Sequence, residues 1–200
     1  MLRIALTGGI ATGKSCVART LRESAVHTID ADQVARDVVR PGSAGLAAVV
    51  ARFGAGVLRA DAHLDRLALA RLVFADAAAR RDLERLVHPG VREGIERFFA
   101  GLPPGAVGVA EVPLLYETGW VATFDLALVA ACRRDTQRVR LAARDALTDG
   151  EVDERLAAQW PIEDKARLAD AVVVTEGTMA STVAQAERLA RWLRGRSHPS

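Results

Sequence analysis

Short apolar runs alternate with longer segments of helical periodicity along this chain. Runs of strand length occupy residues 2–6, 26–29, 106–111, 125–131 and 171–174. Helical patterns occupy residues 16–21, 33–39, most of 44–100, 134–158 and 179–194. Parallel strands need long crossover connections and are covered on both faces. This order therefore predicts an α/β fold in which a parallel central sheet lies between two layers of helices.

The lengths of the connections predict how the chain is divided. We expect a single domain over residues 1–200, with its core at about 1–30, 105–132 and 170–195. A helical insert is expected at about 31–104 and a helical lid at about 133–168. Pro89 suits the first position of a helix, so His88 is expected at a junction between helices. Residues 195–200 are expected to form a frayed tail.

Residues 8–15 read Gly-Gly-Ile-Ala-Thr-Gly-Lys-Ser and fit the phosphate-loop pattern G-x-x-x-x-G-K-[ST]. Glycines allow successive backbone N–H groups to face phosphate oxygens, and the N-terminus of the following helix adds positive potential. We expect Lys14 to contact the β- and γ-phosphates of a nucleoside triphosphate and the Ser15 hydroxyl to bind Mg²⁺. The residues expected at the nucleotide are Gly9, Ile10, Ala11, Thr12, Gly13, Lys14, Ser15 and Cys16.

The alternative for this segment is a chance glycine-rich turn before a helix. The chain has only two lysines, Lys14 and Lys165, beside 25 arginines, and one of the two stands at the lysine position of the motif. A compact ammonium group in a chain that otherwise uses arginine favours a phosphate contact. The sequence therefore predicts a nucleoside triphosphate site in which Lys14 is an exposed residue.

Asp30 and Asp32 follow the second strand-like run. Strand ends at the carboxyl edge of an α/β sheet face the ligand crevice. Alternation along an extended chain would place both carboxylates on one side, with Ala31 opposite. They could orient an acceptor hydroxyl, accept its proton or reach Mg²⁺ through water. The competing interpretation is that Asp32 only caps a helix beginning at Gln33. The phosphate loop favours the chemical role.

Arg138, Arg140 and Arg144 lie on the helix expected after the fourth strand, and the last two share one face. Arginines on a helical lid can neutralise a phosphoryl group during its transfer. An exposed face of arginines is also common in this composition, and taken alone these residues favour a solvated surface. His88 alone likewise favours a structural role. Residues 111–117 combine a strand end, a proline and two leucines, which fits the wall of a crevice.

Charge and composition exclude several classes of function. The net charge is +2, the arginines are dispersed among acidic residues, and only 4% of the residues are aromatic, so nothing indicates nucleic-acid binding. No apolar run reaches the ~18 residues of a membrane span, and no signal peptide opens the chain. Cys16 and Cys132 fit no metal spacing and are expected to be free thiols. We expect a cytoplasmic protein that is a monomer, with at most weak self-association.

Together these segments resemble the dephospho-coenzyme A kinase family. The resemblance runs in order from about residue 2 to 193 and includes the phosphate loop, Asp30-Ala31-Asp32 and His88-Pro89. Residues 112–117 are similar to the PLLFE segment of the family. Further matching positions are residues 38–42, Phe53-Gly54, residues 64–66, Leu69, Phe74, Gln137, Arg140, Arg144, Gln159, Lys165 and Ala169-Asp170.

The resemblance implies a phosphate-loop kinase that uses ATP to phosphorylate the ribose 3′-hydroxyl of dephospho-coenzyme A, the last step of coenzyme A synthesis. It implies that Asp32 activates the acceptor and that Arg140 stabilises the transition state together with Lys14. Arg144 would support the nucleotide. ATP, Mg²⁺ and dephospho-coenzyme A are the expected ligands. The residues that the resemblance places at the acceptor are Asp30, Asp32, Arg66, His88, Pro113, Leu114 and Glu117.

The chain departs from the family pattern in two places. The phosphate loop has Ala11-Thr12-Gly13 where the family usually has Gly-Ser/Ala-Gly, and Cys16 replaces a frequent threonine. Ala11 introduces a Cβ where a left-handed backbone is expected. Near the last strand, Thr175-Glu176-Gly177 replaces the usual Asn-x-Gly beside adenine.

Two competing functions remain open at this point. A nucleoside or nucleotide kinase of the same architecture would share the chemistry and differ in its acceptor. A nucleotide-dependent switch would bind partners and hydrolyse slowly. A GTPase switch needs an asparagine in its guanine motif, and this chain contains no asparagine. Only an ATP-dependent switch survives from that class.

Overall fold

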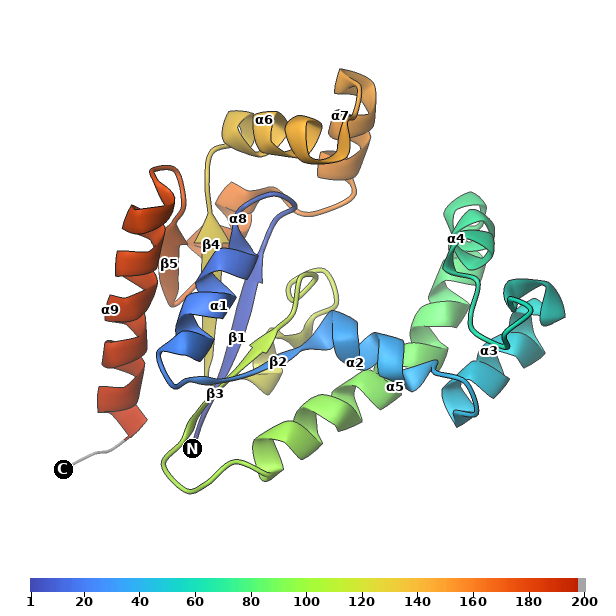
Figure 1. The fold of residues 1–200 in the computed structure, drawn as a ribbon, viewed down its shortest axis with the longest axis horizontal. Coiled ribbons are helices and arrows are strands. Elements are labelled where there is room, and N and C mark those ends of the chain that lie inside the picture. The colour runs from blue at the N-terminus through green and yellow to red at the C-terminus, as the bar shows by residue number, and fades with distance from the viewer. Residues whose placement is uncertain (198–200) are drawn as a thin grey trace. The chain divides into compact units, whose positions relative to one another are not determined.

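A computed structural model describes residues 1–197, which form two compact units (Figure 1). One unit comprises residues 1–29 and the chain from residue 101 onward, and the other comprises residues 30–100. The first unit is built on a parallel five-stranded sheet in the order β2-β3-β1-β4-β5. Its strands are β1 (Leu2–Gly8), β2 (His27–Asp30), β3 (Val107–Glu111), β4 (Leu126–Ala131) and β5 (Ala171–Val174).

The central position of β1 follows from its apolar sequence. Ile4 pairs with Val109 of β3 on one side and with Leu126 of β4 on the other, so β1 has neighbours on both edges. Helices α1 (Lys14–Glu23) and α9 (Met179–Ser197) pack together beside the sheet (Figure 1). They bury a continuous core whose fully enclosed side chains include Ile4, Leu6, Val17, Leu21, Leu128 and Leu193. The α/β fold with a parallel sheet is confirmed.

Three helices connect β4 with β5, and the first two make a small cluster of their own. They are α6 (Arg134–Asp145), α7 (Asp149–Ala157) and α8 (Ile162–Arg167). Leu141, Val152 and Leu156 form the buried centre of the α6–α7 pair, and Ile10 and Ala11 of the phosphate loop pack against it. The predicted lid region therefore contacts the phosphate loop through apolar side chains. A short 3-10 helix, η2 (Trp120–Thr123), precedes β4.

The second unit is mainly helical, with one antiparallel β-bridge between Leu58 and Leu64. It contains α2 (Ala31–Val38), α3 (Ala44–Phe53), the 3-10 helix η1 (Ala55–Val57), α4 (Arg66–Ala75) and α5 (Ala77–Ala100). Its buried cluster is made by Val39, Leu46, Val49, Val57 and Leu69. None of the helices among residues 1–197 is long and apolar enough to cross a membrane.

The expected helix junction at His88-Pro89 is wrong. Helix α5 runs without interruption from Ala77 to Ala100 and contains Pro89 in its interior. A Cβ added to Gly90 would come within 2.9 Å of Val38, and one added to Gly94 within 2.5 Å of Val34. This close packing against α2 holds α5 together where proline removes a backbone hydrogen bond.

The helix cap in the Asp30-Ala31-Asp32 segment also differs from expectation. Helix α2 begins at Ala31, and its N-cap is Asp30, whose carboxylate accepts the N–H of Asp32 at 2.9 Å. Asp32 lies in the first turn of the helix and does not cap it. The alternation argument fails too, because only Asp30 belongs to the strand.

The C-terminal helix is longer than its pattern predicts. Helix α9 extends to Ser197, so residues 195–197 are helical and not frayed. The rest of the expected tail, residues 198–200, lies outside the described residues.

Candidate active site

The phosphate loop has a concave backbone that suits an anion. Ala11 and Gly13 both have left-handed backbones, with φ of 59° and 81°, on either side of buried Thr12. Alternating left- and right-handed residues turn successive N–H groups to one side, which creates an anion-binding concavity. In the described part of the chain, the N–H groups of Gly13, Lys14 and Ser15 have no acceptor. These donors are free for phosphate at the N-terminus of α1.

Close contacts explain two residues of the loop. A Cβ on Gly8 would lie 2.6 Å from the Thr12 hydroxyl oxygen and 2.9 Å from the carbonyl oxygen of Ala130. A Cβ on Gly9 would lie 2.6 Å from the Gln137 amide nitrogen. A backbone oxygen blocks any side chain at Gly8, whereas a side chain at Gly9 would displace the end of the Gln137 side chain.

Lys14 is not the exposed residue that the sequence led us to expect. Its ammonium group lies 2.9 Å from Oε2 of Glu111, and the two side chains are only 17% and 7% exposed. Arg22 approaches the other carboxylate oxygen at 3.5 Å. Glu111 ends β3, directly beside β1. This buried carboxylate holds Lys14 at the base of the phosphate loop.

Ser15 fits the metal role expected of it. Its side chain is exposed in the first turn of α1 and makes no hydrogen bond within residues 1–197. Those residues contain no cluster of three or more histidine, cysteine, aspartate or glutamate side chains that could bind a metal ion. Mg²⁺ typically uses few protein ligands together with substrate phosphates and water, and one hydroxyl beside the phosphate loop suits that pattern.

Two side chains of the lid region bind the backbone of one residue of the phosphate loop, Ile10. The Gln137 side chain, on α6, donates to the carbonyl oxygen of Ile10 at 2.7 Å. The Gln159 side chain, just after α7, accepts the N–H of Ile10 at 2.9 Å. Because the same lid helices also pack on Ile10 and Ala11, loop and lid are joined by polar and apolar contacts together.

Arg138, Arg140 and Arg144 of α6 have different partners. Arg140 donates to the carbonyl oxygen of Thr175 at 2.7 Å, and the Thr175 hydroxyl donates to the carbonyl oxygen of Thr12 at 2.6 Å. Arg140 is therefore connected to the phosphate loop through one residue. Arg138 pairs with Asp149 and Asp153 of α7 and stabilises the lid.

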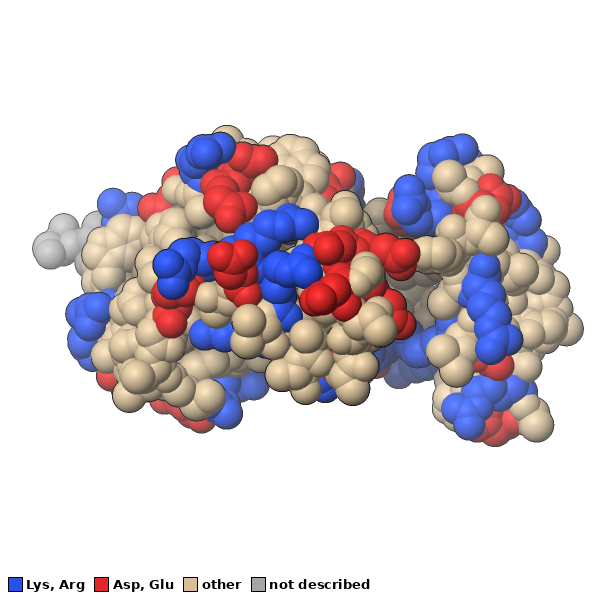
Figure 2. All heavy atoms as spheres, turned by 90° about the horizontal axis from the view of Figure 1, so that it is seen from above, with Lys and Arg blue, Asp and Glu red and all other residues tan. Residues whose placement is uncertain are grey.

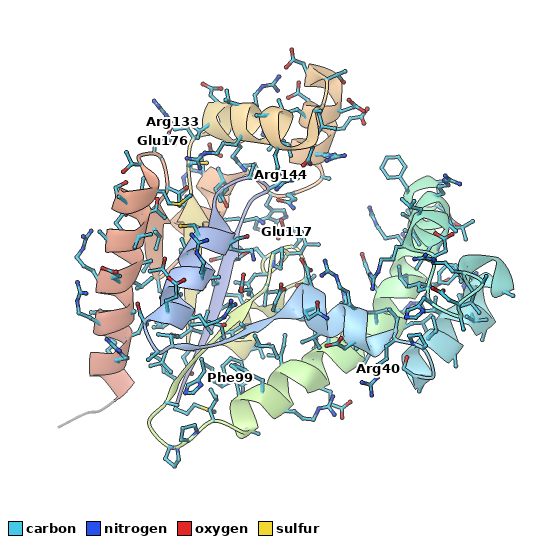
Figure 3. The ribbon with its side chains drawn as sticks, in the orientation of Figure 1. Arg40, Phe99, Glu117, Arg133, Arg144 and Glu176 are labelled. Atoms are coloured by element: carbon cyan, nitrogen blue, oxygen red, sulfur yellow. The ribbon has the colours of Figure 1, made fainter. Side chains whose placement is uncertain are left out.

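Arg144 lies in the last turn of α6 (Figure 3). It makes a two-point ion pair with Asp145, at 2.8 and 3.0 Å, which raises the pKa of the guanidinium. Figure 2 shows basic and acidic side chains intermixed over α6 and α7, in agreement with such pairing. A phosphate would have to compete with Asp145 for Arg144.

Glu176 has a structural role in the segment Thr175-Glu176-Gly177, which replaces the Asn-x-Gly usual in the family. Its carboxylate accepts the Thr136 hydroxyl, the backbone N–H of Arg133 at 2.8 Å and the Arg133 guanidinium at 3.0 Å (Figure 3). These hydrogen bonds, first the one from Thr136, lower the pKa of Glu176 from 4.5 to about 2. The loop after β5 is therefore attached to the start of α6.

Residues 111–117 have an ion pair at each end, Lys14–Glu111 at the first and Lys165–Glu117 at the second. The ammonium of Lys165, which is fully buried, binds Glu117 at 2.7 Å and the carbonyl oxygen of Pro113 at 3.2 Å. Glu117 also accepts the backbone N–H of Trp160, whose ring stacks on Tyr116. Burial raises the pKa of the Tyr116 hydroxyl.

Each of the two lysines of the chain is thus paired with the glutamate at one end of residues 111–117. The structure gives Glu117 a role in fixing this segment, while Leu114 remains exposed beside it. The sequence placed Glu111 in the wall of a crevice and Lys165 among the positions that match the family, but it did not predict that each of them forms an ion pair. The scarcity of lysine was the signal that could have drawn attention to Lys165.

The acceptor-side residues of the second unit occupy three places. Asp30 and Asp32 begin α2. Arg66 begins α4 and lines a cavity of about 490 Å³. His88 lines another cavity, on α5, and burial lowers its pKa, which favours the neutral imidazole. Arg66 and His88 line two different cavities of this unit.

Comparison with known proteins identifies the family. The family profile described as "Dephospho-CoA kinase" matches residues 2–181. This chain belongs to the dephospho-CoA kinase family. Curated relatives of that name include one from Anaeromyxobacter dehalogenans, which is 47% identical over 194 residues and spans 96% of this chain and 92% of its own. One from Symbiobacterium thermophilum is 43% identical over 188 residues, spanning 92% of this chain and 78% of its own.

Solved structures support the same fold. A crystal structure from Thermus thermophilus superposes with a TM-score of 0.80 at 32% identity, covering 94% of this chain and 95% of its own. A dephospho-CoA kinase from Campylobacter jejuni superposes with a TM-score of 0.75 over 98% of both chains, and at 23% identity it shows the fold alone. The family uses ATP to phosphorylate dephospho-CoA and so makes coenzyme A.

Proposed function

We propose that this protein transfers the γ-phosphoryl group of ATP to the ribose 3′-hydroxyl of dephospho-CoA with the residues described above. The observation that carries the proposal is the phosphate loop, where the left-handed backbones of Ala11 and Gly13 leave N–H donors free beside Lys14. When ATP binds, Lys14 exchanges its pairing with Glu111 for the β- and γ-phosphates. The negative charge of the nucleotide offsets the lost ion pair.

Mg²⁺ is the metal that we propose for this reaction, and when bound it would neutralise negative charge on the phosphates. Ser15 is the protein ligand, since its hydroxyl is exposed and has no other partner within residues 1–197. Lys14 supplies a second positive charge at the same phosphates.

Asp32 orients the acceptor and takes its proton. It lies in the first turn of α2, and its carboxylate is not needed as the helix cap, because Asp30 already fills that position. As the 3′-oxygen attacks the γ-phosphorus, its proton passes to the Asp32 carboxylate and the bond to ADP breaks. Lid arginine Arg140 stabilises the charge on the transferred group, and Arg144 supports the nucleotide. Pro113, Leu114 and His88 complete the acceptor side.

The test is a turnover assay with ATP, Mg²⁺ and dephospho-CoA. We expect stoichiometric ADP and coenzyme A, with far lower rates on a panel of nucleosides and nucleotides. Preferred phosphorylation of another acceptor would redirect the proposal to that substrate. ATP-dependent structural change without a phosphorylated product would indicate a switch and contradict it.

Two further expectations stay predictions. Cys16 and Cys132 are both free thiols, the state typical of a reducing cytoplasm, where we place the protein. A monomer is the expected oligomeric state, and size-exclusion chromatography with light scattering would test it.

A further inference from the structure

Lys165, on α8, is a buried titratable residue that the proposed chemistry does not use. Its side chain is 0% exposed, and it is one of only two lysines in a chain with 25 arginines. A buried ammonium group is costly unless opposite charge and hydrogen-bond acceptors surround it. The flexible stem and compact charge of lysine suit an enclosed site with few acceptors better than a planar guanidinium with five donors. What this charge does therefore depends on its partners.

The Lys165 ammonium binds both ends of one short segment, residues 113–117. Oε1 of Glu117 lies 2.7 Å from Nζ, and Nζ donates to the carbonyl oxygen of Pro113 at 3.2 Å. Leu114, between these two residues, is 42% exposed and can contact a ligand. One buried cation thus fixes both ends of a segment that presents an apolar side chain to solvent.

The Pro113 carbonyl oxygen also connects the segment with the phosphate loop. It accepts the hydroxyl of Thr7, which is fully buried, at 3.0 Å. Thr7 stands near the end of β1, and the next residue is Gly8, where the phosphate loop begins. Lys165 and Thr7 therefore bind the same carbonyl oxygen, and the segment has a defined place relative to the loop.

Glu117 (Figure 3) connects the segment with the chain that follows α7. Its Oε1 accepts the backbone N–H of Trp160 at 3.0 Å, and the Trp160 ring stacks on Tyr116 with 6.2 Å between the ring centroids. Oε2 of Glu117 is buried and has no hydrogen-bond partner among the residues that the structure describes. Over residues 1–197, Lys165 is the one cation paired with this carboxylate.

Loss of the ammonium would release both ends of the segment. A buried carboxylate without its cation is strongly unfavourable, so Glu117 would turn toward water and give up the Trp160 N–H. The phosphate loop would keep its own partners, because two side chains of the lid region bind the backbone of Ile10. The consequences therefore fall on residues 113–117 and leave the nucleotide side in place.

We propose that Lys165 is a positioning residue for the acceptor, which sets the affinity for dephospho-CoA by holding residues 113–117 beside the phosphate loop. The proposal rests on the proposed function, in which Pro113 and Leu114 belong to the acceptor side. The enclosed ammonium touches neither substrate and acts through the Pro113 carbonyl and the Glu117 carboxylate. A displacement of about 1 Å in a positioning group can cost roughly 10²-fold in rate, so an anchor at both ends of the segment matters.

The test removes the ammonium in two ways. Lys165→Met keeps the length of the side chain without its charge. Lys165→Met combined with Glu117→Gln also removes the unpaired carboxylate, and the glutamine oxygen can still accept the Trp160 N–H. This double variant should fold even if the single one does not. Leu193→Ala is the control for lost stability, because Leu193 is fully buried in the core that α9 shares with the sheet.

We would measure Tm, the Kd of dephospho-CoA by calorimetry, and KM for dephospho-CoA and for ATP. Lys165→Met and the double variant should raise Kd and KM for dephospho-CoA roughly 10- to 100-fold and leave KM for ATP near wild type. Leu193→Ala should lower Tm and leave both KM values near wild type. Glu117→Gln alone, in which Lys165 still binds Pro113, should raise KM for dephospho-CoA less than the double variant.

Three results would overturn the role of Lys165 alone. Dephospho-CoA values near wild type at a lowered Tm, or equal increases in KM for both substrates, would show that Lys165 only stabilises the fold. Equal KM values for dephospho-CoA in Glu117→Gln and the double variant would assign the whole effect to Glu117. A wild-type protein that is inactive on dephospho-CoA would overturn the proposed function and this role with it.

Discussion

The buried amide of Gln137 donates to the carbonyl oxygen of Ile10 at 2.7 Å, which attaches the first lid helix to the phosphate loop. Gln159, after the second lid helix, accepts the N–H of the same residue. The backbone N–H and the carbonyl oxygen of one residue, Ile10, are therefore both bound by side chains of the lid region. A hydrogen bond shielded from water is strong, so movement of the lid and rearrangement of the loop are coupled.

Replacement of Gln137 should disturb both loop and lid. Gln137→Ala leaves the Ile10 carbonyl without its buried partner and should cost about 1–2 kcal/mol in the free energy of unfolding. Gln137→Glu keeps the shape but sets a carboxylate oxygen against that carbonyl, and we expect a larger loss of ATP affinity. Chemical denaturation and ATP titration measure the two effects. Equal ATP affinity in wild type and Gln137→Glu would show that the lid and the loop are independent.

Lys14→Ala should lose turnover and stability together. The substitution removes the phosphate contact and leaves the buried Glu111 carboxylate with Arg22 alone, a loss of about 1–3 kcal/mol. Adding Glu111→Gln to this variant removes the unpaired charge and should restore the stability but not the turnover. Denaturation and steady-state kinetics on both variants separate the two roles. Near-normal activity of Lys14→Ala would contradict the phosphate-loop assignment.

Glu176 should make stability depend on pH in the acid range. Its folded pKa of about 2 lies below the ordinary value of 4.5, so the unfolded chain takes up the proton first as the pH falls. The contribution of Glu176 is fully present above pH 4.5 and is lost as the pH falls through the folded pKa. We expect the Tm difference between wild type and Glu176→Gln to be constant from pH 7 to 5 and to shrink below 4.5. A difference that does not vary down to pH 3 would contradict the role given to these hydrogen bonds.

The fold could be predicted because its signals are local. The strand-length apolar runs and the Gly and Pro breaks set the sheet and most helix limits, and the phosphate loop is encoded in eight consecutive residues. The expected left-handed backbone at Ala11 is also present. Each of these features depends on neighbours in sequence.

The errors came from contacts between residues far apart in sequence. Pro89 lies inside α5 because Gly90 and Gly94 let that helix approach Val34 and Val38 of α2. Lys14 is shielded because Glu111, 97 residues later, ends the neighbouring strand. No local pattern contains such information.

Arg140→Ala should lower kcat far more than it weakens ATP binding. A lid arginine acts on charge that develops during transfer, and arginines of this type contribute roughly 10³- to 10⁵-fold in rate. Arg138→Ala is the control on the same helix, because Arg138 pairs only with exposed acids of α7 among the described residues. We expect it to change kcat little. Equal losses in kcat and in ATP affinity for Arg140→Ala would show that Arg140 binds the ground-state nucleotide.

Asp32→Asn should lower turnover and leave the protein folded. Asparagine keeps the size of the side chain but cannot accept the acceptor proton, and positioned proton transfer contributes roughly 10² to 10⁴ in rate. Stability should not change, because the cap of α2 is Asp30. Binding of ATP and dephospho-CoA should stay near wild type.

Asp30 offers the matched comparison. Asparagine caps a helix about as well as aspartate, so Asp30→Asn should keep the free energy of unfolding near wild type. Asp30→Ala should lower it by about 0.5–2 kcal/mol. If Asp32 is the base, turnover falls at least roughly a hundredfold in Asp32→Asn alone, with its Tm near wild type. If the segment only fixes the start of α2, kcat should fall only in the variant whose Tm falls, Asp30→Ala. Asp32→Asn should then stay active. Tm and kcat measured on the same preparations of all three variants decide between a proton acceptor and a helix terminus.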